Sequence, residues 1–125
     1  MEDGKHVILC VDDDPDIVEY LKVVLEASGY AVKTAASAEE AMRRYREVNP
    51  DALIVDLMME EIDAGTGLVT ELKAAGNRAP VFMLSSVGDN LSRTIDTAGL
   101  GLAGVLQKPL DSDVLLSLLR ARLQR

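Results

Sequence analysis

Four short apolar runs, each followed at once by a polar residue, constrain the fold of this chain more than any other feature. The runs lie at residues 7–11, 53–55 and 80–84, and a shorter one, Val105-Leu106, continues through Gln107 as a short strand. Short runs of apolar, largely β-branched residues, such as the first, are typical of strands that are buried on both faces. Such strands need helices above and below them, so the runs predict a parallel sheet between two helical layers.

Segments with the spacing of amphipathic helices separate these runs. Asp14, Pro15 and Gly29 mark the start and stop of a helix at 15–28, and a capping box opens a helix at 37–48. A weaker strand at 31–36 lies between these two helices. Three further helices are predicted: a short one carrying Leu68, Val69 and Leu72, a weak glycine-rich one within 89–104, and a final one from about residue 112. The alternation predicts an α/β fold, a doubly wound five-stranded parallel sheet with five helices.

Length and charge limit the classes of function. With 125 residues the chain fits one domain, residues 1–125, with residues 1–5 as a short tail. A net charge of −8 and 3% aromatic residues argue against direct binding of nucleic acid, because phosphate backbones need a positive field and bases need stacking surfaces. We therefore expect a folded domain whose partners are proteins.

Cysteine content and hydropathy indicate the compartment. Cys10 is the one cysteine, so neither an internal disulfide nor a cysteine-rich zinc site can form. The first apolar run, Val7–Val11, is too short for a signal peptide or a membrane span. A cytoplasmic protein without membrane contact is the expectation.

The polar residues after the runs lie at the carboxyl ends of the predicted strands. Asp12 and Asp13 follow the first run, and Asp56, Ser85 and Lys108 follow the other three. The carboxyl ends of parallel strands converge at one rim of the sheet, which is where ligands bind in open α/β folds. An acid after a strand is often only the N-cap of the next helix, so no single one of these residues carries the interpretation.

The acids at this rim predict a metal site. Asp14 already caps the first helix, which leaves Asp12 and Asp13 for another role. Each close pair of carboxylates costs about 1 kcal/mol in water and about 4 kcal/mol at an effective dielectric constant near 20. Mg2+ would neutralise them, since it binds carboxylates together with substrate phosphate. Three carboxylates, Mg2+ and Lys108 sum to zero formal charge, which suits phosphoryl transfer.

Four motifs together resemble the receiver domain of response regulators in two-component signalling. They are Val11-Asp12-Asp13-Asp14-Pro15, Val55-Asp56-Leu57-Met58-Met59, Ser85-Ser86 and Lys108-Pro109. The resemblance covers the chain from Val7 to Leu123. It implies a flavodoxin-like sheet with strand order 2-1-3-4-5.

The resemblance also implies which residues accept the phosphoryl group and bind the metal. Asp56 would accept the group from the phosphohistidine of a sensor histidine kinase or a phosphotransfer protein. Asp13 would bind Mg2+ directly and Asp12 through water. Asp56 and the backbone carbonyl of Met58 would complete the metal ligands.

The same resemblance implies how the domain would respond. Lys108 would pair with the phosphoryl oxygens, and Ser85, next to Ser86, would supply the switch hydroxyl. A phosphoryl group on Asp56 adds about one negative charge, which draws donors toward it. The domain would then be a phosphorylation-dependent switch and not a stand-alone enzyme, although it would catalyse its own phosphoryl transfer and dephosphorylation.

Two positions depart from the usual receiver pattern. Receivers commonly have a proline where this chain has Glu60, and the predicted loop from Glu60 to Gly67 is two or three residues longer than usual. Its acids, Glu61 and Asp63 among them, add negative charge near the metal site. The position three before Lys108 usually holds Tyr or Phe as a rotamer switch, and here it holds Val105.

Two other functions compete with the signalling switch. A Mg2+-dependent phosphatase of the haloacid dehalogenase type also uses an aspartate after a strand. That family has the motif Asp-x-Asp at its nucleophile, and here Met58 stands in place of the second acid. A receiver kept only as an interaction module is the second alternative. The intact set of site residues argues against it.

The final helix predicts a contact surface. Its apolar residues cover an arc of about 200°, wider than the roughly 100° that packing on one sheet face requires. The surplus lies at Leu116 and Leu123. We expect the weak helix 89–104, the strand 105–107 and this final helix to form the surface for a second copy or an effector.

Overall fold

A computed structural model describes residues 4–56, 64–85, 102–107 and 110–123 of the chain. The strands are β1 (Val7–Val11), β2 (Ala31–Ala35), β3 (Ala52–Asp56), β4 (Val81–Ser85) and β5 (Gly104–Gln107). The described helices are α1 (Pro15–Ala27), α2 (Ala38–Val48), α3 (Ala64–Ala74) and α6 (Ser112–Leu123). The predicted alternation is confirmed over these residues, and the helix predicted within 89–104 falls largely outside them.

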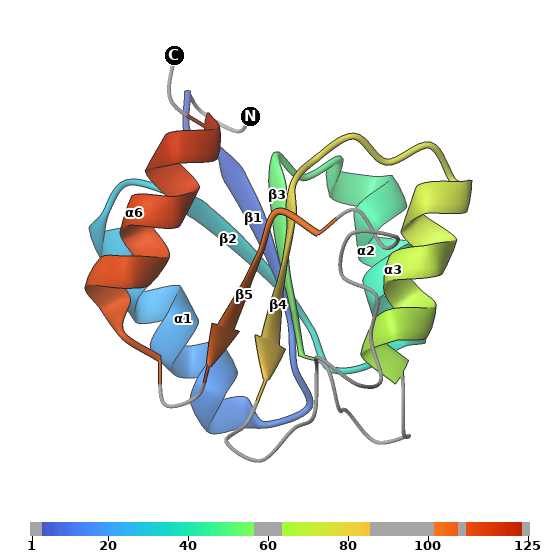
Figure 1. The fold of residues 1–125 in the computed structure, drawn as a ribbon, viewed down its shortest axis with the longest axis horizontal. Helices are drawn as coiled ribbons and strands as arrows, with labels where there is room; N and C mark the ends of the chain where they lie inside the picture. Colours follow the sequence, from blue (N-terminus) through green and yellow to red (C-terminus); the bar gives the residue numbers. More distant parts are fainter. Residues whose placement is uncertain (1–3, 57–63, 86–101, 108–109, 124–125) are drawn as a thin grey trace.

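The five strands form one parallel sheet in the order β2-β1-β3-β4-β5. Helices α1 and α6 cover one face, and α2 and α3 cover the other (Figure 1). The doubly wound, flavodoxin-like prediction is therefore confirmed. All strands run in the same direction, so their carboxyl ends share one edge of the sheet, at the bottom of Figure 1.

The core consists of two apolar layers, because successive side chains of a strand point to opposite faces. Leu9, Leu53 and Met83 pack with α2 and α3, whereas Ile8, Ile54 and Phe82 pack with α1 and α6. The short apolar runs form β1, β3, β4 and part of β5. Strands β1, β3 and β4 are buried at every position, whereas β5 is buried only at Leu106. The prediction of strands buried on both faces is confirmed for these three.

Capping residues fix where the first two helices begin. The Asp14 carboxylate accepts a hydrogen bond from the Asp16 N–H at 2.9 Å, which caps α1. The Ser37 hydroxyl accepts from the Glu40 N–H at 3.1 Å, and the Glu40 carboxylate accepts from the Ala36 N–H at 2.7 Å. Both predicted helix starts are confirmed.

Helix α3 begins earlier than predicted. The interpretation of residues 60–67 as a loop is wrong for its second half, because Ala64 is the first helical residue. The glycines at 65 and 67 suggested a loop, but Leu68, Val69 and Leu72 bury against the sheet and stabilise the helix. Two glycines cost about 1 kcal/mol each in a helix, which this burial offsets. Residues 57–63, with Glu60, lie outside the described residues.

The predicted apolar surplus on the final helix is wrong for Leu123. This side chain is 7% exposed, and Leu116 is partly buried against the same core. The cluster that buries α6 includes Leu21 and Leu25 of α1 as well as sheet residues, so the helix buries a wider arc than one sheet face needs. The exposed apolar residue of α6 is instead Val114, at 48%.

The Asp51 side chain links two strands at the start of the sheet. The Asp51 carboxylate accepts from the Val7 N–H at 2.7 Å and ties the chain before β3 to β1. Burial raises the pKa of Asp51, but the hydrogen bond from the Val7 N–H and the positive charges nearby outweigh it, so the pKa is lowered. Burial, helped by the Asp12 charge, raises the pKa of the Cys10 thiol to about 12, as expected of a core group. Within the described ranges, every helix is too short or too polar to span a bilayer.

Candidate functional site

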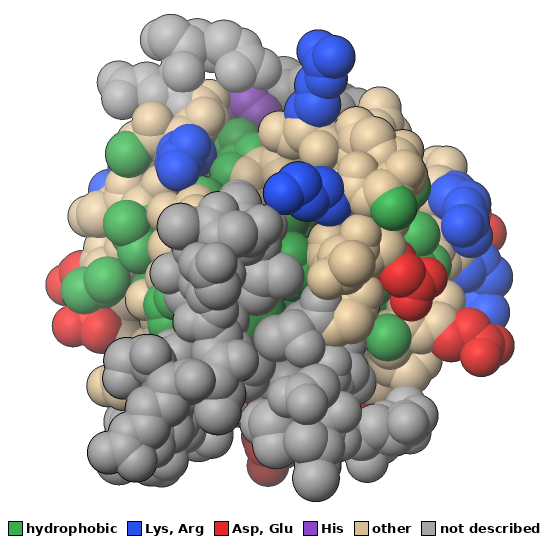
Figure 2. All heavy atoms as spheres, turned by 45° about the vertical axis from the view of Figure 1, so that its right-hand side comes forward, with side chains coloured by type: hydrophobic (Ala, Val, Ile, Leu, Met, Phe, Trp, Pro, Cys, Tyr) green, Lys and Arg blue, Asp and Glu red, His purple; other side chains and the backbone are tan. Residues whose placement is uncertain are grey.

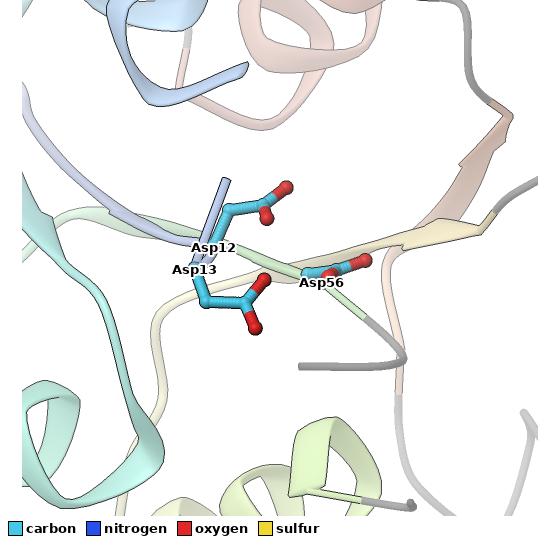
Figure 3. Close-up of side chains that lie close together, drawn as sticks. All are labelled: Asp12, Asp13 and Asp56. Atoms are coloured by element: carbon cyan, nitrogen blue, oxygen red, sulfur yellow. The ribbon is translucent and has the colours of Figure 1, made fainter. Parts of the chain in front are cut away.

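Three carboxylates meet at the carboxyl edge of the sheet. Asp12 and Asp13 follow β1, and Asp56 is the last residue of β3. One oxygen of each carboxylate lies within 4.8 Å of the others. Figure 3 shows the three groups extending to the same side of the sheet. The structure therefore brings together the three acids that the sequence placed at one rim.

Backbone hydrogen bonds fix the direction of Asp12. Its N–H donates to the Ala35 carbonyl at 3.1 Å and continues the pairing of β1 with β2. Its Oδ1 accepts from the Asp14 N–H at 2.9 Å, which closes the turn into α1. The three consecutive acids therefore have different roles. Asp14 caps the helix, Asp12 accepts the hydrogen bond that closes the turn, and Asp13 is exposed at the rim.

Strand register places the other two residues. Asp56 is paired with Leu84 in β4, and Ser85 is the next residue along that strand. Neighbouring strands lie about 4.8 Å apart, so Ser85 is close to the acids. Its Oγ is buried and has no hydrogen-bond partner among the described residues. The Ser85 hydroxyl is therefore a hydrogen-bond donor that lies close to the carboxylates.

The electrostatics of this cluster favour a bound cation. Asp12 and Asp56 are 1% and 4% exposed, so solvent screens their charges poorly. Carboxylate oxygens are the ligands that hard divalent cations prefer. The three acids can hold a metal ion, as the sequence predicted for a cation with oxygen ligands.

A cavity beside the acids is lined in part by Glu40, a residue that the sequence pattern did not place at the site. The cavity has a volume of about 290 Å3 and is lined by Asp12, Asp13, Thr34 and Glu40, among others. Glu40 was interpreted only as part of a capping box. Because β2 ends at the same rim as β1, the capping box that follows β2 also lies there.

Three further predicted site residues lie outside the described residues. They are Met58, Ser86 and Lys108. Gln107, which precedes Lys108, is paired with Ser85, so β5 ends beside the serine. Val105 lies on β5 opposite Met83 and is 36% exposed.

Comparison with known families gives a match over nearly the whole chain. The family profile described as the response regulator receiver domain matches residues 8–120. The match includes all three acids, Ser85 and Val105.

Individual relatives agree with this match. The transcriptional regulatory protein PrrA of Mycobacterium leprae is 38% identical over 123 residues, which cover 94% of this chain and 50% of that protein. The chain thus spans about half the length of the curated relatives it matches.

Solved structures show the same fold. A response regulator receiver domain protein from Clostridium thermocellum has a TM-score of 0.86 and 29% identity, with 96% of this chain and 95% of that one covered. The chemotaxis protein CheY4 of Vibrio cholerae has a TM-score of 0.85 and 26% identity, with 96% and 100% covered.

Proposed function

The chain belongs to the response regulator receiver domain family of two-component systems, and we propose that Asp56 is its phosphorylation site. One observation carries the assignment. Asp56 ends a central strand, 4% exposed, with the carboxylates of Asp12 and Asp13 within 4.8 Å. A buried acid with this surrounding is suited to hold a cation on one side and receive a phosphoryl group on the other.

The proposed reaction is an in-line displacement at phosphorus. A carboxylate oxygen of Asp56 attacks the phosphorus of a phosphohistidine, and an O–P bond forms while the P–N bond breaks. The imidazole leaves with the electrons of that bond and takes a proton from solvent. In dephosphorylation, water attacks the same phosphorus and the carboxylate leaves. The domain is in this sense a catalyst of its own modification.

The resident cation that we propose is Mg2+, held by Asp12, Asp13 and Asp56 with the Met58 carbonyl. Bound there, it would neutralise charge on the phosphoryl oxygens. The chain's own residues then orient the acceptor. The Asp14 N–H holds Asp12 at 2.9 Å, and β4 holds Asp56 in register.

The response to phosphorylation is proposed to begin at Ser85 and Lys108. The buried Ser85 hydroxyl can donate to a phosphoryl oxygen once the group is present, and Lys108 follows the strand paired with Ser85. Ser86 is proposed to assist at the same loop. With Val105 in place of an aromatic residue, movement of this loop and of the segment beyond it would carry the signal.

Partners follow from this chemistry. We propose a sensor histidine kinase or phosphotransfer protein as donor, in the cytoplasm, where the free thiol of Cys10 stays reduced. A second copy, an effector or an output domain is proposed to bind across the predicted helix 89–104, β5 and α6. Among the described residues of this surface, Val105 and Val114 are the exposed large apolar ones.

Incubation with acetyl phosphate and Mg2+ tests the function against its competitors. A receiver accumulates a phosphoprotein whose acyl phosphate is cleaved by hydroxylamine. A phosphatase of the dehalogenase type would release phosphate continuously without such accumulation. An interaction module would show neither. Either of the last two outcomes overturns the proposal.

Replacing Asp13 by Asn should stabilise the metal-free domain and remove its response to Mg2+. Loss of one repelling carboxylate contributes about 1 kcal/mol, since Asp13 is exposed and partly screened. In the parent protein, Mg2+ at about 100 times its Kd should add about 2.7 kcal/mol. Thermal unfolding with and without Mg2+ measures both effects.

The matched control for this experiment is Glu47→Gln. Glu47 is an exposed acid in the last turn of α2, far from the rim, and the charge change is the same. It should leave the Mg2+ response intact. A parent protein whose unfolding ignores Mg2+ would contradict the metal site.

A further inference from the structure

A second cavity lies at the opposite edge of the sheet, where the strands begin. It has a volume of about 430 Å3, within the range of small-ligand sites. The ends of α3 and α6, the turn before β4 and the residue before β5 form its walls. We call it the basal cavity. A five-residue strand is about 16 Å long, so the basal cavity is separate from the acidic rim.

Positive charge converges on the basal cavity. Lys73 in the last turn of α3, Arg78 in the following turn and Arg122 in the last turn of α6 all line it. None of the described residues that line it is an Asp or Glu, although the chain has 21 acidic and 13 basic residues. Figure 2 shows Lys and Arg side chains across the upper part of the view, which is the end of the molecule where the strands begin in Figure 1.

The turn that carries Arg78 is held by its own hydrogen bonds. The Gly76 N–H donates to the Lys73 carbonyl and the Asn77 N–H to the Leu72 carbonyl, each at 3.0 Å, with Gly76 at φ +88°. This is a Schellman motif. It satisfies two carbonyls at the end of α3 that would otherwise repel an anion. The Asn77 side chain exchanges two hydrogen bonds with the Ala79 backbone and fixes the turn further.

Helix-dipole effects do not account for this arrangement. Cations in the last turn of a helix are favoured by the dipole, which explains Lys73 and Arg122 taken alone. Arg78 is outside any helix, and Arg120 is in the last turn of α6 without lining the cavity. Among the described residues, neither Arg78 nor Arg122 has a carboxylate within ion-pair distance.

We propose that the basal cavity binds a small polyanion of the class of inorganic pyrophosphate or a nucleoside diphosphate. Arg78 and Arg122, which come from different segments, match at least two negative charges on a compact ligand, and Lys73 lies in the same wall. The apolar side chains of Val69, Pro80 and Val81 in the same wall suit an organic body attached to the charged group. A concave site of this volume fits such a ligand better than an extended acidic peptide.

Amide chemical shifts of 15N-labelled protein test the proposal. Titration is done in EDTA, so that no divalent cation directs the anion to the acidic rim. Pyrophosphate and ADP should each give saturable shifts in residues 73–81 and 102–104. The double variant Arg78→Gln/Arg122→Gln should weaken pyrophosphate binding about tenfold or more.

Because the double variant removes two charges, the single variant Arg122→Gln is compared with the matched control Arg120→Gln, which removes one charge from the same helix turn outside the cavity. The control should change affinity less than about twofold, because solvent screens Arg120. Equal weakening by this control would show diffuse attraction only and overturn the site. Absence of saturable shifts, shifts confined to the acidic rim, or tighter binding of a polyglutamate peptide than of pyrophosphate would overturn it too.

Discussion

Asp56→Asn should abolish the phosphoryl group that the parent protein gains from acetyl phosphate and Mg2+. Asn keeps the size and the strand pairing with Leu84 but removes the anionic oxygen that attacks phosphorus. The expected result is one added phosphoryl group on the parent protein by intact mass and none on the variant. Chelation of Mg2+ by EDTA should abolish the modification as well.

Asp51→Asn is the control, at the residue just before the start of the same strand. The Asp51 carboxylate accepts a hydrogen bond from the Val7 N–H, and an amide oxygen can still accept it. This variant should be phosphorylated like the parent protein. Labelling that persists in Asp56→Asn would place the modification on another residue, and the assignment of Asp56 would be wrong.

The sequence was sufficient for the sheet and the acidic rim because both depend on local patterns. An apolar run as short as Val7–Val11 leaves little choice besides a buried strand. Once the strands are parallel, every residue after a run lies at one edge. Asp12, Asp13 and Asp56 could therefore be grouped without coordinates. The strand order itself came from the resemblance to receivers and not from the pattern.

The errors arose where neighbours in space decide the outcome. A helical wheel treats the sheet as the one apolar surface, so it placed Leu123 outside, whereas the core cluster shared with α1 buries it and leaves Val114 exposed. The glycines before Leu68 suggested a loop, whereas tertiary packing keeps them helical. Intrinsic helix propensity predicts a helix poorly where the apolar face of that helix can pack against a sheet.

The charge cluster of the basal cavity also depends on neighbours in space, so the sequence pattern did not predict it. Arg122 is far in the sequence from Lys73 and Arg78, and each of the three alone has the pattern of an ordinary surface charge. Only the return of α6 to the edge where α3 ends brings them to one cavity. A charge pattern that depends on non-consecutive elements needs the fold before it can be seen.

Phe82→Ala should destabilise the domain by about 3–5 kcal/mol, a large share of the 5–15 kcal/mol that holds a typical domain together. Phe82 is fully buried as the second residue of β4, paired with Ile54 of β3 and Gly104 of β5. Its removal leaves a cavity in the layer under α1 and α6. Urea unfolding measures the loss, and Val23→Ala, at a site 58% exposed, should change stability by no more than about 0.5 kcal/mol.

Gly104 provides a second test of the packing of Phe82, because the absence of a Cβ at Gly104 leaves room for the Phe82 ring. A Cβ at Gly104 would lie 3.3 Å from Cδ1 of Phe82, tighter than ordinary van der Waals contact. Gly104→Ala should therefore cost stability in the parent protein and cost less, or stabilise, in the Phe82→Ala background, where the added methyl group fills part of the cavity. The double-mutant cycle should give a favourable coupling of at least about 0.5 kcal/mol. Strict additivity would mean that the ring does not use the space beside Gly104.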